Sequence, residues 1–116
     1  MDVETVRNYC ILKPGVSESF PFDQTTLVFK VGSKMFALLS LDSNFTMNLK
    51  CDPGKAIELR ESYSCVLPGY HQNKTHWNTI VLGELPKEQL LFQWIDHSYE
   101  LVFNSLTIKE KSRIKN

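Results

Sequence analysis

LVFKVGSKMFALLSL, residues 27–41, is the stretch that decides the fold. Its first part, LVFKV (27–31), is rich in β-branched and aromatic residues, and its second part, KMFALLSL (34–41), is almost continuously apolar. Gly32 and Ser33 between them predict a tight hairpin turn. Since a strand that is apolar on both faces is covered on both sides or central, we expect an antiparallel hairpin whose second strand lies inside a sheet.

Two further strands are predicted C-terminal to this hairpin. After a turn at 42–44, the stretch FTMNLKC (45–51) alternates between apolar and polar residues, so its apolar side chains share one face. WNTIVL (77–82) is a fourth strand by the same criteria. The sequence leaves open whether the residues around Val66 form another strand.

Helices are predicted before, between and after these strands, and residues 18–26 are expected to form a loop. The first helix is capped by Asp2 and ends at KPG (13–15), and the second is capped by Asp52 with Pro53 in its first position. The longest helix is expected to begin at Pro86, and a capping box of Thr107 and Glu110 begins a short terminal helix. The apolar stripe of the longest helix consists of Leu91, Trp94, Ile95 and Val102, and Ser98 lies on the same face.

The order of these elements predicts the fold class. Strands and helices are segregated rather than alternating, which is typical of an α+β fold. We therefore expect a two-layer sandwich, an antiparallel sheet with helices packed on one face. A chain of 116 residues is long enough for one domain with a real core, so residues 1–116 are predicted to be a single domain.

Charge and targeting signals limit the possible partners and location. Thirteen basic residues balance thirteen acidic ones, so a nucleic-acid role requires a local patch rather than a global positive field. The N-terminal MDVETVRNYC has no apolar signal region, and no apolar run approaches the roughly 20 residues of a membrane helix. We expect a cytoplasmic protein with no membrane association and with reduced thiols.

Metal and nucleophile chemistry is not favoured by the spacing of candidate residues. Cys51, Cys65, His71 and His76 are zinc-type ligands, but neither pair has the short spacing of a zinc clip. Cys65 and His71 do not sit in a pattern that activates a thiol. Asp96 and His97 are adjacent on the predicted longest helix, and adjacent helical residues do not face each other. We therefore predict no metal, no cofactor and no catalysis.

One polar loop concentrates the residue types that recognise ligands. PGYHQNKTHWNT (68–79) supplies flat aromatic faces, positive charge and hydrogen-bonding amides, a combination suited to nucleic acid. The candidate binding residues are Tyr70, His71, Asn73, Lys74, His76, Trp77 and Asn78. The alternative is structural, because loop side chains often bond their own backbone, and Trp77 opens an apolar strand. For Trp77 we expect burial, with its indole N–H hydrogen-bonded.

Four blocks of the sequence together resemble the MmcQ/YjbR family of small bacterial proteins. They are FPFDQTTLVFKVGSKMFALLSL, LKCDPGKAIELRESY, PGYHQNKTHWNTI and DHSYELV, and the resemblance runs from Tyr9 to about Arg113. It implies a fold similar to CyaY-like α/β sandwiches and a DNA-binding role with a double-wing motif. Iron binding is not expected, because Asp2 and Glu4 are the acidic residues of the first helix and form no acidic ridge.

These observations lead to two functional hypotheses. The first is a non-enzymatic bacterial protein that binds DNA through the 68–78 loop and neighbouring lysines such as Lys50 and Lys55. The alternative is a protein- or small-ligand-binding module that uses the same groove and has no nucleic-acid role. A salt-dependent affinity would distinguish the first from the second.

Overall fold

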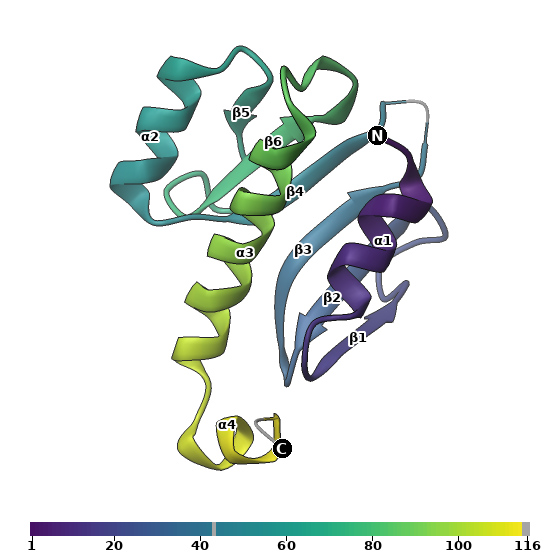
Figure 1. Cartoon of the computed structure of the whole chain (residues 1–116), viewed down its shortest axis with the longest axis vertical. Coiled ribbons are helices and arrows are strands. Elements are labelled where there is room, and N and C mark those ends of the chain that lie inside the picture. Colours follow the sequence, from purple (N-terminus) through teal and green to yellow (C-terminus); the bar gives the residue numbers. More distant parts are fainter. Residues whose placement is uncertain (43, 115–116) are drawn as a thin grey trace.

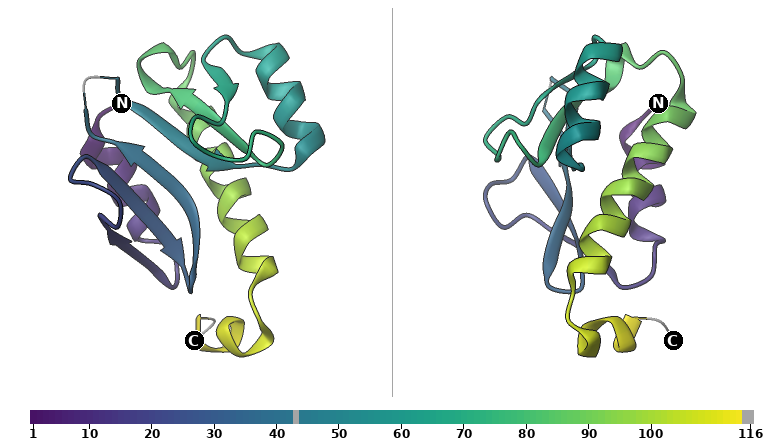
Figure 2. Two further views of the ribbon diagram at one scale, coloured as in Figure 1. Left: turned by 180° about the vertical axis from the view of Figure 1, so that it is seen from behind. Right: turned by 90° about the vertical axis from the view of Figure 1, so that its left-hand side faces the viewer.

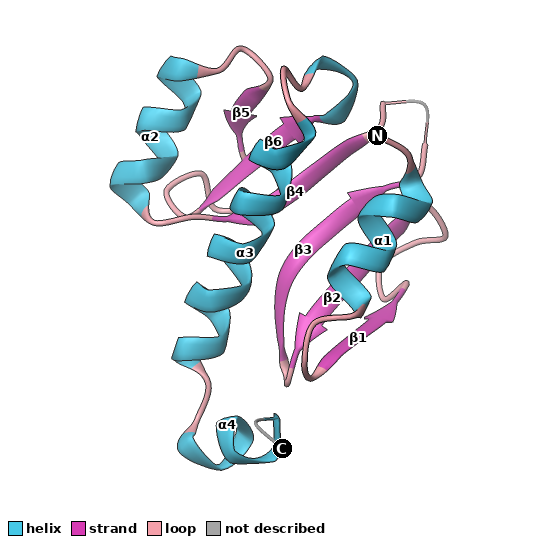
Figure 3. Ribbon diagram, in the orientation of Figure 1, coloured by secondary structure: helices cyan, strands magenta, loops and turns pink. Residues whose placement is uncertain are grey.

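The computed structural model describes residues 1–42 and 44–114, which form helices and one six-stranded sheet (Figures 1 and 3). The helices are α1 (Val3–Ile11), α2 (Pro53–Ser62), α3 (Glu88–Ser105) and α4 (Ile108–Ile114), with a 3-10 turn η1 (Leu82–Glu84). The strands are β1 (Val16–Ser19), β2 (Thr26–Val31), β3 (Lys34–Ser40), β4 (Thr46–Lys50), β5 (Val66–Pro68) and β6 (Trp77–Val81). None of the helices in the described ranges is both long enough and apolar enough to cross a membrane.

The sheet is antiparallel throughout, with the strand order β1-β2-β3-β4-β6-β5. The predicted hairpin is confirmed: Val31 pairs with Lys34 across a turn in which Gly32 has a φ of +59°. Glycine adopts this left-handed conformation without the steric cost that a Cβ imposes. The second strand of the hairpin, β3, lies inside the sheet, as its continuous apolar run predicted.

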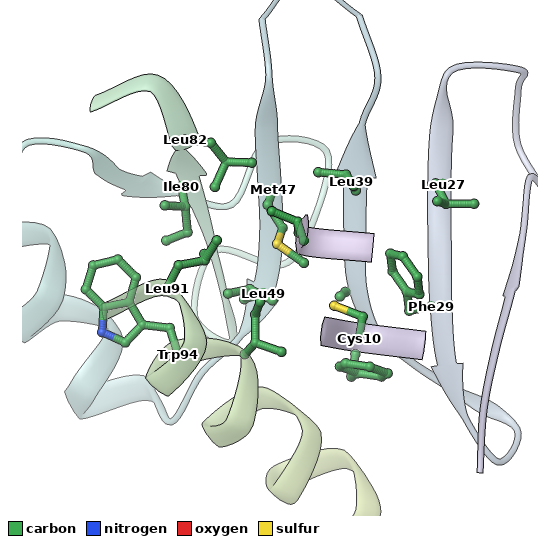
Figure 4. Close-up of a cluster of buried hydrophobic side chains, with 14 of the residues drawn as sticks. Cys10, Leu27, Phe29, Leu39, Met47, Leu49, Ile80, Leu82, Leu91 and Trp94 are labelled. Carbon is green, nitrogen blue, oxygen red and sulfur yellow. The ribbon is translucent and has the colours of Figure 1, made fainter. Parts of the chain in front are cut away.

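One face of the sheet carries the helices, so the predicted two-layer α+β architecture is confirmed. Figure 4 shows Leu39, Met47 and Ile80 of three strands in one buried cluster with Leu91 and Trp94 of α3. Helix α1 buries Val6 and Cys10 in this core. Helix α2 buries Ala56, and its Leu59 packs against the core beside β5 and β6. The opposite face of the sheet carries no helix and is called the outer face below (Figure 2, right).

The helix caps follow the sequence signals. Asp2 accepts a hydrogen bond from the backbone N–H of Thr5 at 2.8 Å, and Asp52 accepts one from Lys55 at 3.2 Å. In the terminal capping box, Thr107 caps α4 through the N–H of Glu110 at 3.1 Å. The Glu110 carboxylate accepts a bond from the N–H of Ser33 at 3.1 Å and so ties α4 to the β2–β3 turn.

Three expectations about element boundaries need correction or completion. The stretch Val16–Ser19, partly included in the predicted loop, is strand β1, which pairs with β2 at the sheet edge. It is short and mostly polar, so it lacks the apolar alternation by which strands are recognised. The open question around Val66 is settled by β5. Helix α3 begins at Glu88 rather than at Pro86, because Lys87 has an extended backbone.

The turn expected at 42–44 includes residue 43, which lies outside the described residues. Next to it, Asp42 accepts a bond from the N–H of Asn44 at 2.9 Å. Phe45, which was expected to open the following strand, has a φ of +44° and precedes β4. Its side chain nevertheless packs against the core.

Ser98 of α3 holds the point where β3 and β4 separate. These strands pair at Leu39↔Met47, Leu38↔Asn48 and Ala37↔Leu49, so the next rung would join Phe36 and Lys50. The buried Ser98 hydroxyl instead donates to the Phe36 carbonyl at 2.6 Å and accepts from the Lys50 N–H at 2.9 Å. A side chain of α3 therefore substitutes for one rung of the sheet.

We predict that Ser98→Ala lowers the free energy of unfolding by about 1–3 kcal/mol, because it leaves a buried carbonyl and a part-buried N–H without their partner. Ser112→Ala is the matched control. The Ser112 hydroxyl also bonds a backbone carbonyl, that of Ile108, but it is exposed on α4, so we expect a loss below about 0.5 kcal/mol. Urea denaturation of both variants measures the difference. Equal losses would contradict a special role for Ser98.

Candidate functional site

Two loops project from the outer face of the sheet, on the side away from α3 (Figure 2, right). One connects β1 to β2 and contains FPFDQ (20–24). The other, loop 69–76, connects β5 to β6 and contains most of the polar motif identified in the sequence. The functional question is which side chains of these loops are available to a partner.

The base of loop 69–76 is held against β6. The N–H of Gly69 donates to the Trp77 carbonyl at 2.9 Å. A Cβ added to Gly69 would lie 2.7 Å from both the Cβ and the carbonyl oxygen of Trp77. Because that contact includes backbone, no larger residue fits without displacing the chain, and glycine is required here by close packing.

Trp77 is a structural residue of the outer face. It is 8% exposed and packs with Val28 and Leu38, beside the partly buried Met35. The predicted burial is confirmed. The expected hydrogen bond from its indole N–H is not found among the described residues, and no buried side-chain nitrogen or oxygen there lacks a partner. Burial leaves little of the ring accessible for stacking on a partner.

A short polar network fixes the position of Tyr70. The Thr79 hydroxyl accepts from the Tyr70 N–H at 2.8 Å and donates to Asn48 Oδ1 at 2.6 Å. The Asn48 amide donates in turn to the Tyr70 carbonyl at 2.9 Å. Since β4 and β6 supply the two partners, the sheet itself sets where the exposed Tyr70 ring stands.

Arg60 of α2 holds the other half of the loop. Its guanidinium donates to Asn78 Oδ1 at 2.7 Å and to the backbone carbonyls of Lys74 and Trp77. Asn78 is 2% exposed and donates to the Ala56 carbonyl at 3.3 Å. Asn78 therefore joins α2 to β6 and is not available to read a ligand.

The remaining motif residues have different positions. Asn73 bonds its own backbone: its side-chain oxygen accepts from the N–H of Thr75 at 2.8 Å. Tyr70 and His71 are exposed, their rings meet edge to face with centroids 4.0 Å apart, and His71 has a φ of +61°. Lys74 and His76 are exposed on the far part of the loop. The exposed candidate residues of the motif are thus Tyr70, His71, Asn73, Lys74 and His76, and of these Asn73 already uses its side-chain oxygen within the loop.

A groove of about 670 Å³ lies between the two loops on the outer face. Phe22 and Asp23 belong to one wall, Tyr70, His71 and Gln72 to the other, and the floor includes Ser40, Thr46 and Asn48 of the central strands. Sequence reasoning did not identify the floor or the first wall. Two features of the sequence could have indicated them: the polar positions of the alternating strand 45–51 for the floor, and the two phenylalanines of FPF in a loop for the wall.

Acidic side chains line the groove, whereas basic side chains lie elsewhere on the outer face. Asp23 and Asp42 line the groove, and backbone N–H groups of Thr25 and Thr26 hold the pKa of Asp23 below its usual range. By strand alternation, Lys30 and Lys50 also lie on the outer face, and Lys74 stands on loop 69–76. Within residues 1–42 and 44–114, no carboxylate lies within 4.0 Å of these three lysine amino groups.

Asp96 and His97, neighbours on α3, make separate structural contacts. Asp96 accepts bonds from Tyr9 and Lys13, joining α3 to α1, while His97 Nε2 accepts from the N–H of Asp52 at 3.2 Å. Burial, followed by the Asp96 carboxylate, raises the pKa of Tyr9 to about 12. In the described part of the chain, no three His, Cys, Asp or Glu side chains are grouped so that they could hold a metal ion.

A model of the YjbR family matches residues 12–101, which include both loops and all six strands of the sheet. The chain belongs to the YjbR family. The resemblance inferred from the sequence blocks is therefore confirmed.

Relatives of this YjbR-family chain cover nearly its whole length. It is 36% identical to the uncharacterised protein YbdF of Escherichia coli O157:H7 over 113 residues, 97% of this chain and 93% of that one. It is 34% identical to the uncharacterised protein YjbR of Escherichia coli strain K12, over 98% of this chain and 97% of that one.

Solved structures support the same assignment. The crystal structure of Deinococcus radiodurans protein DR2400, described as a DUF419 domain, matches with a TM-score of 0.90 and 37% identity, over 97% of this chain and 87% of that one. A Pseudomonas syringae protein matches with a TM-score of 0.76 and 23% identity, over 88% of this chain and 99% of that one, which shows a shared fold alone.

We predict that Trp77→Ala lowers the free energy of unfolding by about 3–5 kcal/mol, as truncation of a large buried aromatic does. Tyr70→Ala, which removes an exposed aromatic seven residues earlier in the same motif, should cost less than about 0.5 kcal/mol. Chemical denaturation of the two variants measures both values. A loss below about 1 kcal/mol for Trp77→Ala would show that the ring contributes little to stability.

We also predict that the three thiols react slowly in the native protein at pH 8. Burial raises the pKa of Cys10 to about 12 and that of Cys51 to about 11, and it also raises the pKa of Cys65. Because the thiolate is the reactive form, a disulfide reagent should modify them rapidly only after denaturation. Fast labelling of one thiol in the folded protein would reopen the case for a nucleophilic cysteine.

Proposed function

We propose that this YjbR-family protein is a non-catalytic DNA-binding protein that uses the outer face of its sheet and loop 69–76. The observation that carries the proposal is the set of outer-face lysines without ion-pair partners among the described residues, Lys30, Lys50 and Lys74. Free amino groups on one face attract phosphates, because each phosphate contact releases condensed counterions from the DNA.

The division of charge across the molecule supports this reading. The chain has equal numbers of acidic and basic residues, so a local surface must provide the attraction. Two carboxylates elsewhere are paired with cations: Glu18 pairs with Arg7, and Asp96 pairs with Lys13. Arg7 lies on α1 and Lys13 just beyond it, both on the helical side of the molecule. The outer-face lysines thus retain their charge for a partner.

The rigid mounting of loop 69–76 supports a recognition role for its exposed side chains. Tyr70 is held through backbone bonds to Asn48 and Thr79, and the Lys74 carbonyl is bonded by Arg60. A loop anchored in this way loses little conformational entropy on binding, which favours affinity. His71 and His76 are exposed on the same loop as Lys74 and offer ring N–H groups to a partner.

A second candidate is a small-ligand-binding module, which is favoured by the groove itself. At about 670 Å³ it is within the size range of ligand pockets, and Asp23 and Asp42 line it. A neutral or cationic ligand would fit this lining, and its affinity would depend weakly on salt. Thermal-shift screening of polar metabolites, compared with oligonucleotide binding, distinguishes the two candidates.

We predict that Lys74→Ala weakens DNA binding to a similar extent for all sequences and lowers the slope of log K against log salt by about one. Fluorescence anisotropy with a short duplex and a single strand, at two salt concentrations, measures both effects. Lys109→Ala is the matched control, because Lys109 is an exposed lysine on α4 at the end of the sheet. It should leave affinity and slope unchanged.

The DNA proposal is contradicted if neither oligonucleotide binds at low salt, where electrostatic attraction is least screened. An equal loss in Lys74→Ala and Lys109→Ala would also contradict it, because attraction would then come from total charge rather than from the outer face.

A further inference from the structure

The groove on the outer face has hydrogen-bonding groups that the protein does not use. Among residues 1–42 and 44–114, the side chains of Ser40, Thr46 and Gln72 have no hydrogen-bond partner, although all three line the groove. Asn48, also on the floor, is held in place by Tyr70 and Thr79. Hydroxyl and amide groups arranged in this way suit a ligand with both donors and acceptors on one edge.

Aromatic side chains stand on both walls of this groove. Phe22 is 63% exposed and belongs to one wall, and Tyr70 is 57% exposed and belongs to the other. An exposed aromatic ring beside a polar floor offers a flat apolar face, on which the face of a planar ring can stack. A ligand that has a planar apolar face and a polar edge would use both features of the groove.

The charge of the lining indicates which part of a nucleotide enters. Asp23 and Asp42 line the groove, whereas the outer-face lysines are not part of its lining. Asp23 is occupied by the N–H groups of Thr25 and Thr26. Asp42 uses Oδ1 for the N–H of Asn44, and its Oδ2 has no partner among the described residues. Carboxylates repel phosphates, but they accept hydrogen bonds from exocyclic amino groups of bases.

We propose that the groove holds one unpaired base of single-stranded DNA, stacked between the loops, and prefers bases with an exocyclic amino group. The phosphates of the same strand lie along Lys50 and Lys74. This inference rests on the DNA-binding role proposed above and adds the strand type and the base. Duplex DNA cannot use the groove in this way without opening, because its bases are paired and stacked.

The test compares the unmodified protein on three probes of equal length: oligo(dC), oligo(dT) and a duplex. Thymine has no exocyclic amino group, so oligo(dC) should bind about tenfold more tightly than oligo(dT), as one specific base contact provides. The duplex should bind more weakly than oligo(dC). Anisotropy titrations at one fixed salt concentration measure all three affinities.

Groove variants show whether the base enters this site. Phe22→Ala and Tyr70→Ala should each weaken oligo(dC) binding by about tenfold, the loss expected for one stacking contact. Thr46→Val, which replaces a floor hydroxyl by a methyl group, should reduce the preference for oligo(dC) over oligo(dT). Phe20→Ala is the matched control, because Phe20 is an exposed phenylalanine in the same loop that does not line the groove.

The outcomes separate this inference from the proposed function. Retained affinity in Phe20→Ala with losses in Phe22→Ala and Tyr70→Ala supports the base site, provided that circular dichroism shows all variants folded. If oligo(dC), oligo(dT) and duplex bind equally, and the groove variants bind like the unmodified protein, DNA binding stands and the base site is overturned. If no probe binds at low salt, both are overturned.

Discussion

The hydrogen bonds of the Ser98 hydroxyl are the interaction on which the arrangement of the sheet depends. An antiparallel ladder that continued past Ala37↔Leu49 would pair Phe36 with Lys50. The hydroxyl of α3 occupies that rung, so β3 and β4 diverge while both backbone groups remain satisfied. It also fixes α3 across the two halves of the sheet, which sets the helical layer against the strands (Figure 1).

The two faces of the sheet have different roles, one in the core and one in the groove, because strand side chains alternate between them. On one face, Met47, Leu49 and Ile80 bury apolar surface against the helices. On the other face, Thr46 and Asn48, which alternate with Met47 and Leu49 along β4, form part of the floor of the groove. A single strand thus stabilises the fold and lines the site, so substitutions on its outer face can change binding without removing core contacts.

The sequence motif around residues 68–79 combines structural and accessible residues, and only the folded chain separates them. Trp77, Asn78 and Asn73 use their side chains to build or hold the loop. Tyr70 and Lys74, close to them in sequence, project to solvent. Residue type does not distinguish these roles, because an aromatic or an amide serves equally well in a core and in a binding site. The distinction comes from Arg60 of α2 and from strands β4 and β6, which are distant in sequence.

The sequence by itself determined the local elements: the hairpin at 27–41, the capped helices at Asp2 and Asp52, and the apolar stripe of α3. It did so because alternation, helical spacing and caps depend on neighbours a few residues apart. The tertiary structure alone decided that β1 and β5 are edge strands, that β4 lies beside β6, and that Phe22 stands across a groove from Tyr70. The β4–β6 pairing joins residues 27 to 35 positions apart, and Phe22 and Tyr70 are 48 positions apart, so no local pattern records which of these segments will meet.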